Sequence, residues 1–476
     1  MKYLIRKLLF VILILSLALF TVSLSACNDS NVKPSYRLYL DYDNDIISGK
    51  VVYKFVNCEN YDLNELVFNL RANAYSEQAS KKPVLESHYS KAFYEGDSFG
   101  KTEILNLLFN GENAPFNLSD DEQFLTVNQS VKKGQITEIE IDFKTTIPKS
   151  NLRLGVTKSG VNLADFFPTA CFFDGNEFKK IPYEPIGDPY FFDACDYEVD
   201  ITLPSCYVVA SSGEPTQTSI EGEKTTYSYK LQGGRDFAFA LSTNYTVFQN
   251  SINGVTLTYY SLTQNGEEFL NLALDCYSFF EKTFGKTPYN TFSLAETDFV
   301  FDGMEFSGLC FLLSSLSDED KKMAIVHETA HQWWGCALSS DQFSSAYVDE
   351  GLCEYSTYLY FLSKDETLAK TIIDSAKSAY KSFFSIEQTL SGKVNSAMVR
   401  DLSTFKSDYE YYCIAYAKGL LTFYEYQQST GLDRTKQNLK KLYNDNYLSE
   451  IGLEEIISTL GKRAHFESFV QGKVLI

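Results

Sequence analysis

Residues 327–335 read HETAHQWWG, and the interpretation of the whole sequence starts from them. A helix is expected over residues 317–335, because a serine can cap its start and a glycine can end it. His327 and His331 lie four residues apart, so on a helix both imidazoles can point from one face toward a single ion. Glu328 projects beside that pair and can act on a water molecule at the ion. Since two of the chain's four histidines fall in this pattern, a metal site explains it better than chance does.

A third ligand is expected from the segment DEGLCEY at residues 349–355. A catalytic zinc ion takes three protein ligands and keeps one position open. Eighteen residues separate His331 from Glu350, which begins the next expected helix. The apolar side of that helix consists of Tyr355, Tyr358, Leu359 and Leu362. The sequence therefore predicts one zinc ion, held by His327, His331 and Glu350.

Four motifs in this order resemble those of the gluzincin zinc aminopeptidases of the aminopeptidase N type. The segments at 327–335 and 349–355 are similar to the family's HExxHQWxG and NEGFAxY and have its eighteen-residue spacing. GMEFSG at 303–308 resembles the GxMEN motif, and YAKG at 416–419 resembles the family's YxKG or YxRG segment. The resemblance covers most of the chain. It implies a zinc peptidase that removes N-terminal residues from peptides.

The resemblance implies a chemical role for two residues beside the ion. Glu328 would act as the general base toward the attacking water and would then pass the proton to the leaving amine. Tyr416 would donate its phenolic hydroxyl to the tetrahedral oxyanion. The chain has 33 tyrosines, so only the YAKG context distinguishes Tyr416 from its neighbours Tyr411 and Tyr412.

The segment with Gly303, Met304 and Glu305 is the part expected to bind the substrate. By the resemblance, the Glu305 carboxylate would pair with the free α-ammonium group, so that the first peptide bond falls on the metal. The chain departs from the family pattern at Asp302 and Phe306, where Gly or Ala and Asn are common. Phe306 could narrow the first pocket or line it for an apolar side chain, and both interpretations stay open.

Three other residues of these motifs are expected to act less directly. Glu354 could accept a hydrogen bond from a zinc-binding imidazole, or it could be a solvated helix carboxylate, and the sequence favours neither. Trp333 and Trp334 are expected to pack behind the metal-binding helix.

The N-terminal residues predict a bacterial lipoprotein signal peptide. Three basic side chains within the first seven residues precede an apolar run over 8–24, and LSAC at 24–27 has the form of a lipobox. Cleavage would remove residues 1–26, and a lipid-modified Cys27 would begin a tether over residues 27–35. An uncleaved membrane anchor is the alternative, because the apolar run is almost long enough to span a bilayer. The expected location is outside the cytoplasm, on the membrane.

Composition limits the partners and the redox chemistry. The net charge of −20 would repel the phosphates of nucleic acid, so no nucleic-acid partner is expected. The same negative charge is compatible with substrates that carry a cationic peptide N-terminus. Removing Cys27 from the ten cysteines leaves nine, none with CxxC spacing, and Cys276 and Cys413 stand among apolar residues. A disulfide framework is therefore not predicted, although export would permit disulfides.

Residues 36–250 have the alternation of an antiparallel sheet domain. Residues 136–143 and 197–203 alternate apolar and polar side chains, and Pro204 ends the second of these strands. Residues 76–117 show weaker periodicity and are expected to form loops and insertions. The whole segment resembles the saddle-like N-terminal β domain of the family.

Residues 251–476 change to the pattern of a small mixed sheet followed by helices. Strands are expected at 254–260, 291–296 and 309–313, and helices at 267–284, 367–384 and 418–428. This is the order that a thermolysin-like α+β catalytic domain ending in helices requires. The predicted protein is thus multidomain, with an antiparallel β domain ahead of the catalytic domain.

The resulting hypothesis is a lipid-anchored zinc aminopeptidase that acts on peptides with a free N-terminus. The alternative is a surface lipoprotein that keeps the fold and binds peptides or partners without hydrolysis. The complete set of motif residues argues against such a loss of activity. The oligomeric state stays open.

Overall fold

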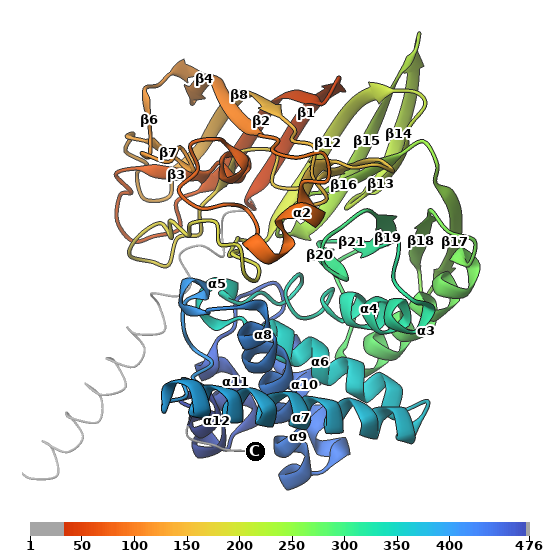
Figure 1. Cartoon of the computed structure of the whole chain (residues 1–476). Helices are drawn as coiled ribbons and strands as arrows, with labels where there is room; N and C mark the ends of the chain where they lie inside the picture. Colours follow the sequence, from red (N-terminus) through yellow and green to blue (C-terminus); the bar gives the residue numbers. More distant parts are fainter. Residues whose placement is uncertain (1–32, 473–476) are drawn as a thin grey trace, which may run out of the picture.

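The computed structural model describes residues 33–472 of the 476-residue chain (Figure 1). Sheets make up the N-terminal half and helices the C-terminal half, as the sequence predicts. The predicted signal peptide at 1–26 and the lipidation site at Cys27 lie outside the described residues. Ser35, the last residue of the predicted tether, is already the first residue of strand β1. No helix within residues 33–472 is both long and apolar enough to cross a membrane.

An eight-stranded sheet forms the body of the N-terminal half. Its order is β14 (Glu214–Glu221), β15 (Lys224–Gly234), β12 (Cys195–Pro204), β1 (Ser35–Asp43), β2 (Ile46–Val56), β8 (Ile136–Thr146), β4 (Lys101–Phe109) and β5 (Glu112–Asn113). Buried and more exposed residues alternate along β8 and β12, which is the period-two pattern of their sequences. All neighbours are antiparallel except β1 and β12, which pair in parallel.

The expectation of loops over residues 76–117 is wrong for its second half. Strand β4 lies within this range and pairs with β8 across the large sheet. The register shifts between Ile104 and Asn106, and this irregularity breaks the alternation from which a strand is recognised in sequence.

Two small sheets complete the N-terminal half. One has the order β13 (Val208–Ser211), β16 (Phe239–Ser242), β10 (Val161–Leu163) and β9 (Leu154–Val156). The other has the order β11 (Thr169–Ala170), β3 (Leu66–Asn69), β7 (Phe124–Val127) and β6 (Phe116–Leu118). Their buried residues join one apolar core with the inner face of the large sheet.

A five-stranded sheet leads into the helical half. Its order is β17 (Thr246–Ile252), β18 (Val255–Ser261), β19 (Thr291–Thr297), β21 (Leu309–Leu313) and β20 (Gly303–Phe306). The predicted boundary between residues 250 and 251 falls inside β17 and remains a prediction. β20 carries the Gly-Met-Glu segment and is an edge strand, paired only with β21 among the described strands. One side of its backbone is therefore available to another chain.

The helices of the C-terminal half share one apolar core, which contains the two buried tryptophans of the HETAHQWWG segment. They are α3 (Gly266–Phe284), α4 (Asp318–Ala330), α5 (Gln342–Ser345), α6 (Tyr347–Leu362), α7 (Glu366–Ser391), α8 (Asp408–Tyr411), α9 (Lys418–Thr430), α10 (Leu432–Asp445), α11 (Leu453–Leu460) and α12 (Arg463–Val470). Trp333 and Trp334 are fully buried, which confirms their expected packing role. Their indole N–H groups donate to the Gly285 carbonyl and the Ser356 hydroxyl. Cys276 and Cys413 are likewise buried thiols.

Helix α4 is shorter than predicted. Ser317 caps its start as expected, but the helix ends at Ala330, and His331 is the C-cap residue. The chain then turns tightly, with the N–H groups of Trp333 and Trp334 both donating to the Ala330 carbonyl. Gly335 follows with φ of +112°, a backbone conformation that glycine tolerates best.

Helices α6 and α9 touch through two glycines, one in the segment DEGLCEY and one in the segment YAKG. A Cβ atom on Gly351 would lie 2.9 Å from the Cα atom of Gly419, and one on Gly419 would lie 2.7 Å from the Cα atom of Gly351. Side chains cannot fit between backbones at these distances. The contact brings Glu350, at the start of α6, close to the tyrosines that precede α9.

Gly419→Ala should therefore destabilise the fold by about 1–3 kcal/mol, the usual cost of overpacking a tight contact. Denaturant unfolding measures this change. Gly452→Ala is the control, since its added Cβ meets nothing closer than 3.6 Å, and it should cost less than about 1 kcal/mol. Equal stability of the two variants would contradict the close contact of α6 and α9.

Candidate active site

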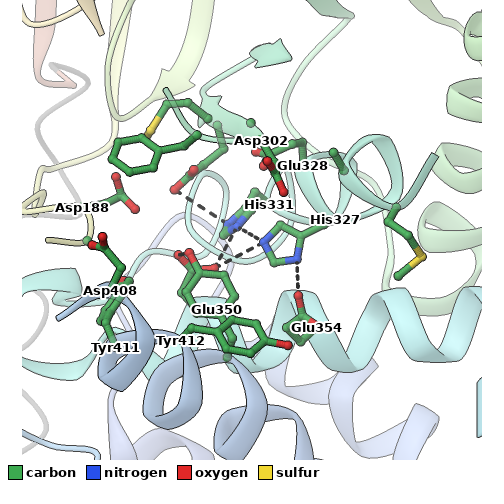
Figure 2. Close-up of a pocket in the computed structure, with 18 of the residues that line it drawn as sticks. Asp188, Asp302, His327, Glu328, His331, Glu350, Glu354, Asp408, Tyr411 and Tyr412 are labelled. Atoms are coloured by element: carbon green, nitrogen blue, oxygen red, sulfur yellow. Dashed lines mark hydrogen bonds and ion pairs between the residues drawn. The ribbon is translucent and has the colours of Figure 1, made fainter. Parts of the chain in front are cut away.

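All the predicted site residues that the structure describes line one pocket. The pocket has a volume of about 530 Å³ and opens between the edge strand β20, helices α4 and α6, and the segment just before α9. Its lining includes every one of them: Gly303, Met304, Glu305, His327, Glu328, His331, Glu350 and Tyr416. Figure 2 shows the two imidazoles facing each other beside Glu350.

The three predicted metal ligands converge on one point. The Nε2 atoms of His327 and His331 are 3.0 Å apart. Glu350 Oε2 lies 3.3 Å from the first nitrogen and 3.5 Å from the second. Ligand atoms that bind zinc tetrahedrally at about 2.0–2.1 Å stand roughly 3.3 Å from one another. The observed triangle therefore has the size that a tetrahedral zinc ion requires.

The hydrogen bonds of the three side chains leave the converging atoms available for a metal. His331 Nδ1 donates to the Trp334 carbonyl at 3.0 Å, which keeps the proton off Nε2. The Tyr416 hydroxyl donates to Glu350 Oε1 at 2.5 Å. Glu350 Oε2 is buried and has no hydrogen-bond partner among residues 33–472. Such an orphaned carboxylate oxygen beside two imidazole nitrogens fits a cation-binding site.

The titration behaviour of the cluster also favours positive charge at its centre. Burial alone would lower the pKa of His327, but the nearby carboxylates of Glu350 and Glu354 raise it to about 10. Burial alone would raise the pKa of Glu350, yet the two imidazoles lower it to about 2. Both shifts reflect the attraction between negative charge on the carboxylates and positive charge on the imidazoles.

Glu354 stands beside the other nitrogen of His327. Its Oε1 atom is 3.0 Å from His327 Nδ1, a close ion-pair distance without good hydrogen-bond alignment. Of the two interpretations that the sequence left open, the contact with the imidazole fits better than a freely solvated carboxylate. The side chain helps to orient the ring and to raise the electron density of Nε2.

A second group of potential ligands overlaps the first but suits a metal less well. Glu305, Glu328 and His331 also bring ligand atoms together. The nearest approach of Glu305 to His331 is 3.9 Å, and it is to Nδ1. That nitrogen already donates to a backbone carbonyl, so it has no lone pair free for a metal. The first group is therefore the better metal site.

Glu328 is held against the edge strand. A Cβ atom on Gly303 would lie 2.4 Å from Glu328 Oε1, so only glycine at position 303 leaves room for this carboxylate. Burial raises the pKa of Glu328 to about 8, while the two imidazoles act in the opposite direction. Its Oε2 atom is buried and lacks a hydrogen-bond partner among the described residues. The carboxylate thus has one oxygen available for proton transfer.

Tyr416 belongs to a π-helical turn over Tyr412–Ala417, between α8 and α9. Its ring lies nearly parallel to the His327 ring, with centroids 5.8 Å apart. π-helical turns occur often at functional sites because they redirect side chains from an otherwise regular helix. Here the turn brings the Tyr416 hydroxyl to Glu350, one of the three converging side chains.

Residues outside the motifs contact the segment that is expected to bind the substrate, or line the same pocket. Arg153, only 5% exposed, donates through Nε to Met304 Sδ at 3.1 Å and pairs with Asp188. His88 Nε2 forms a hydrogen bond with Asp408 Oδ2 at 2.7 Å, although the two residues are 320 positions apart in the sequence. Phe306 is buried in a core with Phe311 rather than facing the pocket, which excludes a direct pocket-lining role. Sequence reasoning missed the contacts of Arg153 and His88 because each joins segments that are distant in sequence.

The edge strand, the HExxH helix and the downstream glutamate together define a zinc metallopeptidase fold. Residues 269–472 match the model of the peptidase family M1 domain. This catalytic half belongs to the M1 family, the gluzincin family of the aminopeptidase N type, whose members are zinc metallopeptidases.

Solved structures with the same architecture support the fold. An M1 zinc metallopeptidase from Deinococcus radiodurans has a TM-score of 0.62 at 14% identity, with 93% of this chain and 94% of that chain covered. A mutant from the same organism bound to a Tyr-Ser-Ala substrate has a TM-score of 0.63 at 14% identity, covering 93% and 95%. A two-domain M1 zinc metallopeptidase mutant bound to L-arginine has a TM-score of 0.62, with the same identity and with 93% and 95% covered. No curated protein matches the chain.

Zinc binding can be tested on the ligands directly. His331→Ala should lose stoichiometric zinc and the rise in melting temperature that zinc gives wild type, because a bound ion stabilises only the folded state. Metal analysis and thermal unfolding, with and without a chelator, measure both effects. The control is His465→Ala, whose imidazole bonds to the Thr422 carbonyl away from the pocket. Zinc retained by the His331 variant would contradict the site.

Proposed function

We propose that this protein is a zinc aminopeptidase that removes single residues from peptides with a free N-terminus. The observation that supports it most strongly is a carboxylate, Glu305, fixed beside the metal-binding cluster. Its Oε1 atom lies 3.9 Å from His331 Nδ1, and its side chain is 8% exposed. A peptide ammonium bound there would bring the first peptide bond, and no later one, to the metal position.

The charge of the pocket supports a cationic end on the substrate. Besides Glu305, Glu328 and Glu350, five acidic residues line its wall: Asp188, Asp302, Asp320, Glu354 and Asp408. Among the described residues that line the pocket, Arg153 is the one arginine, and there is no lysine. The Arg153 guanidinium is paired with Asp188. Such a pocket attracts an α-ammonium group and disfavours an acylated, neutral N-terminus.

The edge strand β20 suits a peptide in extended form. A substrate could add to its unpaired side through main-chain hydrogen bonds. Glu305 and Gly303 lie two residues apart on this strand and face the same side. The peptide would run from its ammonium at Glu305 past Gly303, where Glu328 stands.

The residues of the chain divide the chemistry among them. Zinc, when bound, supplies a Lewis acid and lowers the pKa of water at the site toward neutrality. Glu328 takes a proton from the attacking water at its free Oε2 atom and returns it to the leaving amine. Tyr416 turns its hydroxyl from Glu350 to the developing oxyanion and stabilises it.

The extracytoplasmic location with a lipid anchor at Cys27 remains part of the proposal. It rests on residues 1–27 of the sequence alone. Peptide substrates outside the cytoplasm would suit an enzyme held there.

Glu328→Gln should lower kcat by about 10²–10⁴-fold because the amide cannot take the proton. Zinc content should stay at the wild-type value, since Glu328 is not among the three converging ligands. Release of the fluorophore from aminoacyl-coumarin substrates, together with metal analysis, measures both. The exposed Glu319→Gln on the same helix is the control. Wild-type turnover in the Glu328 variant would exclude the proposed mechanism and favour a protein that only binds peptides.

Glu305→Gln should mainly weaken the use of free N-termini. Loss of a buried charge-assisted contact worth about 1.5–3 kcal/mol raises KM for such substrates roughly 10–100-fold. Comparing peptides with free and N-acetylated ends measures the effect, with Glu319→Gln again as the control. If wild type cleaves both kinds of peptide equally well, the exopeptidase part of the proposal is wrong.

A further inference from the structure

Gln342 is a buried residue directly behind Glu305, outside all four sequence motifs. It is the first residue of α5 and is 8% exposed. Its Nε2 atom donates to Glu305 Oε1 at 3.2 Å and to Asp349 Oδ2 at 2.5 Å. An amide nitrogen has two N–H groups, and here each is used on a carboxylate from a different element.

The contact continues to the metal site through Asp349. This residue lies in the first turn of α6, and its Oδ1 atom accepts a hydrogen bond from the Glu350 N–H at 2.9 Å. Three hydrogen bonds in series thus connect Glu305 on β20 with the backbone of the metal ligand Glu350. Gln342 and Asp349 are not among the residues that line the pocket, so Gln342 acts through Glu305.

Gln342 satisfies two buried carboxyl groups that have few other donors nearby among the described residues. One oxygen of Glu305 and one of Asp349 approach the same amide nitrogen, and each accepts one of its N–H groups. Gly335 leaves space for this arrangement, because a Cβ atom there would come within 3.2 Å of His331 Nδ1 and 3.7 Å of Asp349 Oδ2. A neutral amide provides two N–H groups and adds no charge of its own.

We propose that Gln342 is a positioning residue that fixes the spacing between the Glu305 carboxylate and the metal ligand Glu350. This inference rests on the proposed aminopeptidase function. The spacing decides which peptide bond reaches the metal when the substrate ammonium is held by Glu305. An error of about 1 Å in such a geometry can cost about 10²-fold in rate, so the hydrogen bonds of Gln342 set the one-residue register.

The test is Gln342→Glu, which keeps the shape of the side chain but removes both N–H groups. The matched control is Gln427→Glu. Gln427 is 7% exposed and bonds to Tyr355 and Tyr358 within the helical half, outside the pocket lining. Both substitutions bury a new carboxylate, so both should lower the melting temperature.

Only the Gln342 variant should change substrate recognition. Its KM for substrates with a free N-terminus should rise about tenfold, with a smaller change in kcat and an unchanged zinc content. Its preference for free over N-acetylated peptides should fall by the same factor, and sequencing of products should show release of more than one residue per cut. The Gln427 variant should keep the wild-type KM, preference and product pattern.

The outcomes separate this inference from the function on which it rests. If wild type shows no preference for free N-termini, the proposed function fails. If wild type shows the preference and Gln342→Glu keeps both KM and preference, only the role of Gln342 is overturned. If Gln342→Glu does not fold, Gln342→Met is measured instead, with the same expected change. If Gln342→Glu and Gln342→Met both lose zinc while Gln427→Glu keeps it, Gln342 supports the metal site, and its proposed role in positioning Glu305 is overturned.

Discussion

The structure depends on the convergence of two imidazole nitrogens and one carboxylate oxygen at 3.0 to 3.5 Å from one another. These polar atoms are costly to bury together unless a cation lies between them. Their orientation is therefore enforced by the surrounding fold. The Trp334 carbonyl fixes one ring, Glu354 contacts the other, and the Tyr416 hydroxyl holds the carboxylate.

The positions of these groups follow from where helices end and how closely they approach. Helix α4 stops at Ala330, and the turn that follows returns the Trp334 carbonyl to the second histidine. Glycines at 351 and 419 let α6 and α9 meet at backbone distance, which brings Glu350 and Tyr416 together. Gly303 leaves room for Glu328 in the same way. Small residues thus determine how near the reactive side chains can come.

The sequence could predict the parts of the site that depend on local spacing. Two histidines one helical turn apart need only a helix to share a face, and the motif order indicated which glutamate and which tyrosine join them. The alternation of β8 and β12 likewise revealed the sheet domain. The order of the eight strands did not follow from sequence, because pairing between distant strands depends on the whole fold.

What the sequence could not predict has physical reasons of its own. Strand β4 was expected to be a loop because the irregularity between Ile104 and Asn106 interrupts its period. The early end of α4 depends on a turn whose hydrogen bonds involve the tertiary packing of Trp333 and Trp334. Gln342 and Arg153 each contact residues that are distant in sequence, so no spacing rule could mark them.

A crystal of the zinc-loaded protein, measured on both sides of the zinc absorption edge, would locate the ion. We expect one anomalous peak about 2.0–2.2 Å from Nε2 of His327, Nε2 of His331 and a carboxylate oxygen of Glu350. A peak bound by Glu305, Glu328 and His331, or no peak in this pocket, would contradict this expectation.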